Sequence, residues 1–168
     1  EIDATSLAGS EVFINLAGAG VGDHRWTRKY KQLILSSRVD STSLLARTAA
    51  QVKPKVFIAG SAIGWYGDTA DTAVDESAGP GTGFLADVVV AWEAAAGPAK
   101  DAGIRVVHAR TGLVAAKNGG AWARLLPLFK LGVGGKLGSG NQYWSFISMR
   151  DEISALKFLI TQESISGP

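Results

Sequence analysis

A chain of 168 residues with 46% hydrophobic and 19% charged residues has the composition of one ordinary globular domain. Its net charge is +2, and its 17 lysines and arginines are scattered, which argues against a partner nucleic acid or an anionic membrane surface. The absence of cysteine and the presence of two isolated histidines exclude disulfides and a zinc site, and no apolar run is long enough to span a membrane. A cytoplasmic location is therefore expected.

Three short apolar runs stand at wide intervals along the chain. They are EVFINLAG at 11–18, PKVFIAGS at 54–61 and IRVVHARTG at 104–112. Each run is apolar throughout instead of alternating, which indicates strands that are covered on both faces.

The segments between these runs have helical spacing. Thr27 is the expected N-cap of the first helix, and Pro98 is expected to bend or split the second, which ends at Gly103. The order strand, helix, strand, helix, strand predicts an α/β fold, a parallel sheet with helices on both faces.

The pattern loosens after the third predicted strand. A short helix is expected around 121–131, five glycines fall among residues 132–140, and a short strand is expected at 144–148. Helical spacing then returns from Ile153 to Ile160. We interpret the region between the third predicted strand and this last helical segment as a loop-rich insertion.

Each predicted strand ends in small residues, in the stretches NLAGAG, AGSAIGWYG and RTG. Ligands of open parallel sheets bind beyond the carboxyl ends of the strands, and small residues let a planar or phosphate-bearing ligand approach the backbone. Glycine and alanine at any one strand end can simply form a tight turn. Their presence at all three favours a shelf for a ligand.

Two glycine-rich stretches fail to match the phosphate-binding motifs that they resemble. GAGVG at 18–22 has the spacing G-x-G-x-G, whereas the dinucleotide fingerprint is G-x-G-x-x-G. GVGGKLGSG at 132–140 has Leu137 where a P-loop needs serine or threonine for magnesium, and a helix precedes it. We interpret the second stretch as a mobile loop on the substrate side.

Ser61, at the end of the second predicted strand, and Tyr66, just after it, form the candidate catalytic pair. A serine there can hydrogen-bond a substrate carbonyl, and a tyrosine can donate a proton to a forming alkoxide, as in short-chain dehydrogenases. In those enzymes a lysine lowers the pKa of the tyrosine. The alternative is a packed tyrosine ring whose hydroxyl bonds to backbone.

Two further side chains have competing interpretations. Arg25 follows the first strand end, where a guanidinium can reach a cofactor phosphate, or it is a solvated surface arginine. His108 lies inside an apolar strand, and we interpret it as a core histidine with its hydrogen bonds satisfied.

Six stretches together resemble the extended short-chain dehydrogenase/reductase superfamily, and within it an atypical branch, the NAD-dependent epimerase/dehydratase-like "epimerase family protein" group. They are FINLAGAGVGDHRWT, SSRVDSTSLLARTA, GSAIGWYGD, GFLADVVVAWEAAA, RVVHARTGLV and LLPLFKLGVGGKLGSGNQYWSFI. They occur in the family order across nearly the whole chain, and the last is the most diagnostic of the branch.

The resemblance implies a Rossmann-like fold that is truncated at both ends. Residues 1–168 would form a partial NAD(P)-binding domain without its first three strand units, and about 116–150 would belong to a substrate lobe. The implied cofactor is NAD or NADP. The residues expected to contact it are Leu16, Ala17, Gly18, Ala19, Arg25, Ser61, Arg110, Thr111 and Gly112.

The sequence departs from the extended pattern in two places. Leu85 and Val89 stand where relatives have the tyrosine and lysine of a Tyr-x-x-x-Lys pair, so the lysine is absent and Tyr66 matches a separate Tyr-Gly. Ser148 replaces a histidine that is usual in the branch, which puts a role for that position in doubt.

These observations predict an NAD(P)-dependent oxidoreductase or epimerase-like enzyme that acts on a nucleotide sugar or a small carbonyl, with Ser61 and Tyr66 as catalytic residues. The alternative is a non-catalytic dinucleotide-sensing or partner-binding module that has lost the Tyr-Lys pair. The expected partners are the dinucleotide and a small-molecule substrate, with no metal. The strand EVFINLA would be the fourth of the complete family fold, and it would lose its neighbour there, the first strand. We therefore also expect residues 1–168 alone to self-associate and to bind dinucleotide weakly.

Overall fold

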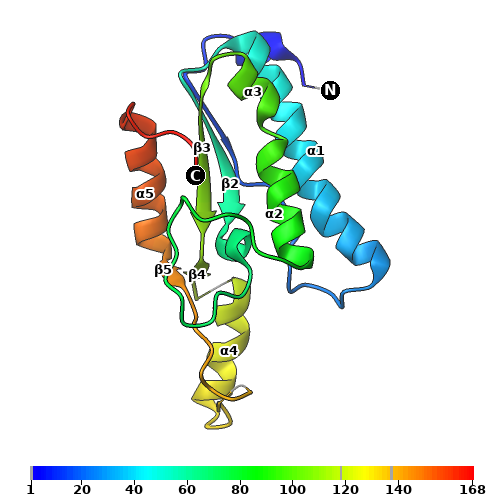
Figure 1. Cartoon of the computed structure of the whole chain (residues 1–168), viewed down its shortest axis with the longest axis vertical. Coiled ribbons are helices and arrows are strands. Elements are labelled where there is room, and N and C mark those ends of the chain that lie inside the picture. Colours follow the sequence, from blue (N-terminus) through cyan, green and yellow to red (C-terminus); the bar gives the residue numbers. More distant parts are fainter. Residues whose placement is uncertain (1, 118, 137) are drawn as a thin grey trace.

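The computed structural model describes residues 2–117, 119–136 and 138–168, so Leu137 of the glycine-rich stretch lies outside the described residues. Its centre is a parallel sheet of three strands, β1 (Val12–Asn15), β2 (Val56–Ala62) and β3 (Arg105–Thr111), in the order β1-β2-β3. Figure 1 shows the strands running downward to a common carboxyl edge. The predicted parallel sheet is confirmed.

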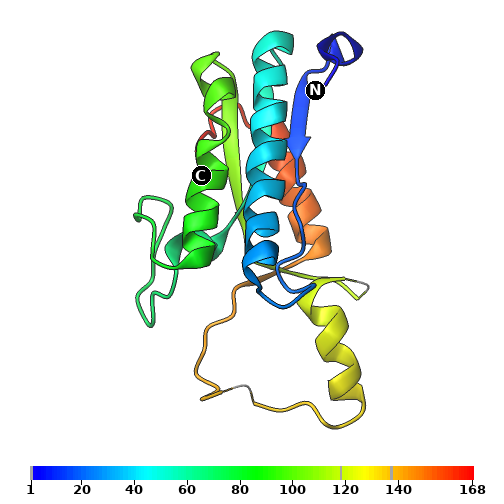
Figure 2. The same cartoon turned by 90° about the vertical axis from the view of Figure 1, so that its right-hand side faces the viewer.

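Helices cover both faces of this sheet (Figures 1 and 2). One face carries α1 (Arg28–Val52), α2 (Phe84–Ala94) and α3 (Gly97–Asp101), and the other carries α5 (Met149–Thr161). The side chain of Thr27 caps α1 by accepting a hydrogen bond from the backbone N–H of Tyr30, as expected. Pro98 lies in the first turn of α3, and the predicted split of the second helix is confirmed.

The core consists of two layers, one on each side of the sheet. Phe13, Phe57 and Val106 pack toward α1 and α3, where small side chains such as Ala49 and Ala99 let the helices approach closely. On the other side, buried strand side chains pack against α5; these are Val56, Ile58 and Val107, and they contact Leu156, Leu159 and Ile160. The strands are apolar throughout because both of their faces are buried.

Arg105 fastens α5 to the sheet from the start of β3. Its guanidinium donates hydrogen bonds to the carbonyl oxygens of Leu159, Ile160 and Ile165, each at 3.0 Å. A cation at the last carbonyls of a helix satisfies groups that have no partner within the helix. Next to it, Gly167 pairs with Val107 in a parallel bridge along the outer edge of β3.

A smaller sheet lies below the central one. It pairs β4 (Leu113–Ala115) in parallel with β5 (Phe146–Ser148), and α4 (Gly120–Lys130) follows β4. The helix expected around 121–131 is confirmed, while the strand expected at 144–148 covers three of those five residues. The spacing did not predict β4, because three residues are too few to show a period.

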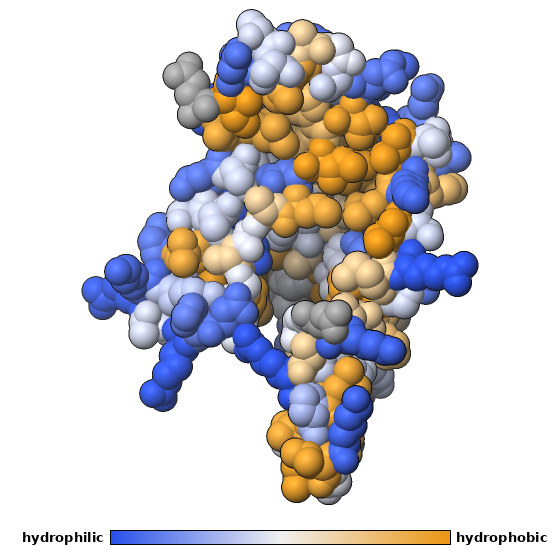
Figure 3. Space-filling model, turned by 180° about the vertical axis from the view of Figure 1, so that it is seen from behind, coloured by the Kyte–Doolittle hydropathy of each residue, from blue (hydrophilic) through white to orange (hydrophobic). Residues whose placement is uncertain are grey.

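Two single-turn 3-10 helices complete the elements, Ala4–Leu7 before β1 and Ile63–Tyr66 after β2. Figure 3 shows apolar side chains gathered at the lower tip of the molecule, where α4 lies in Figure 1. The exposed apolar residues of this segment include Leu128, Phe129 and Leu131. No helix in the described part of the chain is long and apolar enough to cross a membrane.

Candidate active site at the carboxyl edge of the sheet

The carboxyl ends of the three central strands lie side by side, above α4 in Figure 1. The register pairs Asn15 of β1 with Ala59 of β2, and Ser61 of β2 with Arg110 of β3. The three small-residue stretches of the sequence therefore share one edge. This is the edge where open parallel sheets bind their ligands.

The turn that follows β1 is held from behind by the buried side chain of Asn15. Its amide nitrogen donates to the hydroxyl of Thr42 at 2.8 Å, and its amide oxygen accepts from the backbone N–H of Ala17 at 3.1 Å. Asn15 is 6% exposed, so these hydrogen bonds fix the turn from inside the protein.

Arg38 of α1 supports the next residues of the same turn. One of its nitrogens donates to the carbonyl oxygen of Ala19 at 2.9 Å. A Cβ atom on Gly18 would lie 3.0 Å from the Arg38 guanidinium carbon, so a larger residue here would push that side chain back by a few tenths of an ångström. Leu16, Ala17 and Gly18 remain exposed.

Ser61, at the end of β2, is buried and turned toward α2. Its hydroxyl donates a hydrogen bond to Oε1 of Glu93 at 2.5 Å. A serine hydroxyl has a single donor. The predicted hydrogen bond from Ser61 to a substrate carbonyl would therefore compete with Glu93.

Glu93 and Arg110 form an ion pair beside Ser61. Arg110 donates through Nε to Oε1 at 2.8 Å and through Nη2 to Oε2 at 3.0 Å. The side chain of Arg110 is 7% exposed and that of Glu93 is 10% exposed, so the pair is nearly excluded from solvent. Sequence reasoning did not identify this pair, although a carboxylate inside the apolar stretch VVVAWEAAA and an arginine inside an apolar strand were the signal for it.

The electrostatics of these groups follow from the pair. Burial opposes the charge of Glu93, but hydrogen bonds from Arg110 and Ser61 outweigh it and lower the pKa of that carboxyl. The hydrogen bond to Glu93 raises the pKa of Arg110. Both groups are therefore charged at neutral pH.

Tyr66 lies on the other side of Arg110. Nη1 of Arg110 donates to the Tyr66 hydroxyl oxygen at 3.1 Å, and the guanidinium stacks over the ring of Trp65 at 4.1 Å from its centroid. The Tyr66 hydroxyl therefore contacts a charged side chain, and not the backbone as in the alternative interpretation.

A cleft of about 830 Å³ opens in front of Tyr66. Residues of the loop after Tyr66 form one side, and residues of the glycine-rich region before β5 form the other; the lining includes Gly67, Asp68, Thr69, Asp71, Ser139, Asn141, Gln142 and Tyr143. Its volume falls in the range of small-molecule sites. Ile63 and Ser145 connect it to the next cavity.

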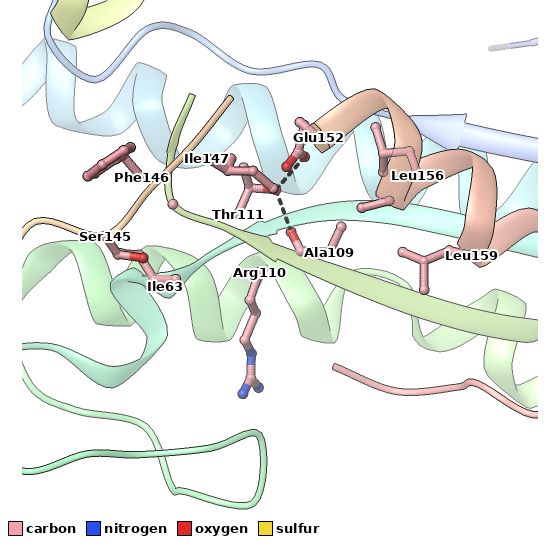
Figure 4. Close-up of a pocket in the computed structure, with 12 residues that line it drawn as sticks. Ile63, Ala109, Arg110, Thr111, Ser145, Phe146, Ile147, Glu152, Leu156 and Leu159 are labelled. Carbon is pink, nitrogen blue, oxygen red and sulfur yellow. Dashed lines mark hydrogen bonds between the residues drawn. The ribbon is translucent and has the colours of Figure 1, made fainter. Parts of the chain in front are cut away.

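Thr111 and Gly112 line a second cavity of about 400 Å³, on the side of β3 that faces α5 (Figure 4). The hydroxyl of Thr111 donates to the carboxylate of Glu152 in α5 at 2.8 Å. Figure 4 shows Arg110 pointing away from this pair, as alternation along a strand requires. Ser148 acts structurally here, because its side chain caps α5 by accepting from the N–H of Asp151.

Two sequence interpretations have different outcomes at this site. Arg25 is exposed on the loop after β1, where its predicted contact with a phosphate stays a prediction. The interpretation of His108 as a satisfied core histidine is wrong, because its buried Nδ1 has no hydrogen-bond partner among the described residues. His108 lies near Glu93 of α2.

The chain matches the model of the NAD dependent epimerase/dehydratase family over residues 2–167. It belongs to this family. Among its family relatives, an epimerase family protein of Mycobacterium bovis is 44% identical over all 168 residues, which are 56% of that protein. An epimerase family protein of Staphylococcus aureus is 40% identical over 161 residues, which cover 94% of this chain and 53% of that protein. The chain thus spans just over half the length of these relatives.

Solved structures of epimerase family members have the same fold. The human epimerase family protein SDR39U1, crystallised with NADPH, is 30% identical with a TM-score of 0.88, covering 99% of this chain and 59% of that one. A nucleoside-diphosphate sugar epimerase from Corynebacterium glutamicum is 35% identical with a TM-score of 0.85, covering 100% of this chain and 35% of that one. The resemblance to the atypical epimerase branch and the Rossmann-like fold are confirmed.

Proposed function

We propose that this protein binds NAD or NADP along the carboxyl edge of the β1-β2-β3 sheet and acts as an oxidoreductase or epimerase-like enzyme. The observation that carries the proposal is the meeting of three strand ends, with the Leu16–Gly18 turn held from behind and exposed in front. The human relative at 30% identity, crystallised with NADPH, supports it.

The residues at this edge fit the nicotinamide half of a dinucleotide. Leu16 and Ile63, at the ends of β1 and β2, are 60% and 37% exposed, so a flat ring has apolar surface to cover. Leu16, Ala17, Gly18 and Ala19 would line the ribose and diphosphate edge; Arg110, Thr111 and Gly112 would lie on the far side of the nicotinamide, and Arg25 would contact a phosphate.

The chemistry needs a proton donor beside the reacting carbonyl. When bound, a nicotinamide cofactor supplies or accepts a hydride. Tyr66 would donate to the oxygen of the substrate or take its proton, and Ser61 would hold that oxygen if it releases Glu93. The substrate would be a nucleotide sugar or a small carbonyl, and residues 116–150 would belong to the substrate lobe, since Ser139 to Tyr143 line the cleft.

The test is the melting temperature of the full-length protein with and without millimolar NADH and NADPH. Both Ala17 and Ala8 are exposed, but Ala8 precedes β1 and lies at the opposite, amino edge of the sheet. We expect Ala17→Leu to abolish the increase in melting temperature and Ala8→Leu to retain it. No increase with either cofactor in the wild type would refute the proposal.

A second candidate is a non-catalytic module that senses dinucleotide or binds a partner. The observation in its favour is that α2 has Leu85 and Val89 at the positions where extended relatives have tyrosine and lysine, and that Val89 is buried. Turnover of a panel of sugar nucleotides and small carbonyls separates the two. A loss of about 100-fold or more in Ser61→Ala or Tyr66→Phe supports the enzyme, and an inactive wild type supports the module.

A further inference from the structure

A tyrosine that exchanges a proton near neutral pH needs a cation beside it to stabilise its phenolate form. The α2 helix offers none at the usual positions, since Leu85 and Val89 are apolar. The structure brings a cation to the hydroxyl from a different element. Arg110, on β3, has Nη1 at 3.1 Å from the Tyr66 oxygen.

This contact determines the direction in which Tyr66 can donate. A guanidinium has donors and no acceptor, so the phenol oxygen accepts from Arg110. The phenol proton is then available to another acceptor. Since Tyr66 lines the 830 Å³ cleft, a ligand in that cleft can provide the acceptor.

Arg110 is itself held in place from two sides. Both carboxylate oxygens of Glu93 bind it, Ser61 binds that carboxylate in turn, and the Trp65 ring lies against its face. A bidentate and stacked arginine has little freedom to move. The nitrogen that faces Tyr66 is therefore fixed at that position before any ligand binds.

The cleft itself is acidic. Its titratable lining groups are Tyr66, Tyr143, Asp68 and Asp71, and no lysine, arginine or histidine is among the described residues that line it. Two carboxylates repel a phosphate group. The part of the substrate next to Tyr66 is better matched by an uncharged group with a carbonyl or hydroxyl oxygen than by a diphosphate.

We propose that Arg110 is a positioning residue that replaces the absent lysine, orienting Tyr66 toward an uncharged carbonyl or alcohol oxygen in this cleft. The inference rests on the proposed function. In reduction, the carbonyl carbon gains a hydride with its two electrons from the reduced nicotinamide cofactor, and the oxygen gains the proton of Tyr66. Arg110 stabilises the phenolate that remains, and solvent in the open cleft returns the proton. The reverse sequence oxidises the alcohol.

The experiment measures kcat and KM of the full-length protein with the best substrate of the carbonyl and sugar-nucleotide panel, for the wild type, Tyr66→Phe and variants of Arg110. The charged groups around Tyr66 are Arg110 from β3, Glu93 from α2, and Asp68 and Asp71 from the loop after Tyr66.

We expect Arg110→Met to lower kcat by about 10-fold or more with little change in KM, because the Tyr66 hydroxyl is then no longer oriented by the arginine. The double variant Tyr66→Phe/Arg110→Met should lose no more than Tyr66→Phe alone, since the arginine acts through the tyrosine. Arg110→Lys should restore part of kcat. Arg47→Met, which removes an exposed arginine on α1, is the control for loss of one positive charge.

A merely structural role for Arg110 would lower turnover in the Tyr66→Phe background as well. An unchanged kcat in Arg110→Met, or a further loss in the double variant, overturns the proposal. If Arg110→Met does not fold, Arg110→Gln replaces it, and an unchanged kcat there also overturns the proposal. An increase in melting temperature with NADH or NADPH that persists in the wild type distinguishes this failure from a failure of dinucleotide binding.

Discussion

Arg110 and Glu93 join β3 to α2 through two parallel hydrogen bonds, at 2.8 and 3.0 Å, in a nearly solvent-free interface. A buried pair of this kind stabilises a fold little compared with apolar residues of similar shape, because both charges are desolvated. The cost of breaking it is much larger, since one charge is then left buried without a partner. This asymmetry gives a specific prediction.

We expect Glu93→Ala and Arg110→Ala each to lower the free energy of unfolding by about 3–5 kcal/mol. The double variant Glu93→Leu/Arg110→Met removes both charges and keeps apolar volume, so its loss should be clearly smaller than that of either single variant. Urea denaturation of the four proteins measures these differences. If the double variant loses the sum of the two single losses, the pair is not coupled as described.

The pH dependence of stability offers a second prediction, centred on His108. Burial lowers the pKa of His108 below its ordinary value of 6.5, Arg110 and Lys100 add to this, and the Glu93 carboxylate opposes it. The unfolded chain therefore binds more protons just below pH 6.5, and stability falls as the pH falls. The slope contributed by one such group is at most about 1.4 kcal/mol per pH unit.

Glu93 acts with the same sign but at lower pH. Its pKa is lowered from an ordinary value of 4.5, so its contribution is complete above that pH and is lost as the pH falls through the lowered value. His108→Gln should reduce the slope between pH 6.5 and 4.5 and leave the acid limb that Glu93 causes. His24→Gln, at an exposed histidine, is the matched control. An unchanged slope in His108→Gln would contradict this assignment.

Arg105 carries the third prediction, because it binds three carbonyl oxygens at and beyond the end of α5. We expect Arg105→Met to destabilise the protein by roughly 1–3 kcal/mol and to increase amide hydrogen exchange in α5 before the rest of the chain. Lys55→Met is the comparison. Its ion pair with Glu11 is exposed, at 71% and 65%, so its loss should cost much less stability than the loss of Arg105.

The sheet could be predicted from the sequence because burial on both faces leaves a plain signal. Phe57 and Ile58 are adjacent in the chain, point to opposite layers of the core and are both fully buried, so the strand has no polar alternation. The meeting of the strand ends followed from the parallel order. The buried strands and their parallel order can both be read from local patterns of residue types in a single sequence.

The pairing inside the candidate site could not be predicted in the same way. Glu93 meets Arg110 because the α2 helix packs at one rotation on β2 and on the turn after it, next to β3, and Ser61 turns to that carboxylate for the same reason. Such distances depend on tertiary packing rather than on a period in the sequence. The buried unpaired nitrogen of His108 is a further result of packing that no pattern of residue types reveals.

The last prediction concerns β1, which pairs with β2 and with no other strand in the described part of the chain. Ile14 and Leu16 are 41% and 60% exposed at this edge. Unpaired backbone groups beside exposed apolar side chains invite pairing between chains.

We expect residues 1–168 expressed alone to self-associate and to bind dinucleotide far more weakly than the full-length protein. Ile14→Lys should reduce the association, because a charge at an edge strand opposes pairing. Leu33→Lys is the matched control, since Leu33 is 48% exposed but lies on α1. Light scattering measures the association, and calorimetry with NADH and NADPH measures the affinity. A monodisperse monomer of the wild-type sequence 1–168 with micromolar affinity would contradict both expectations.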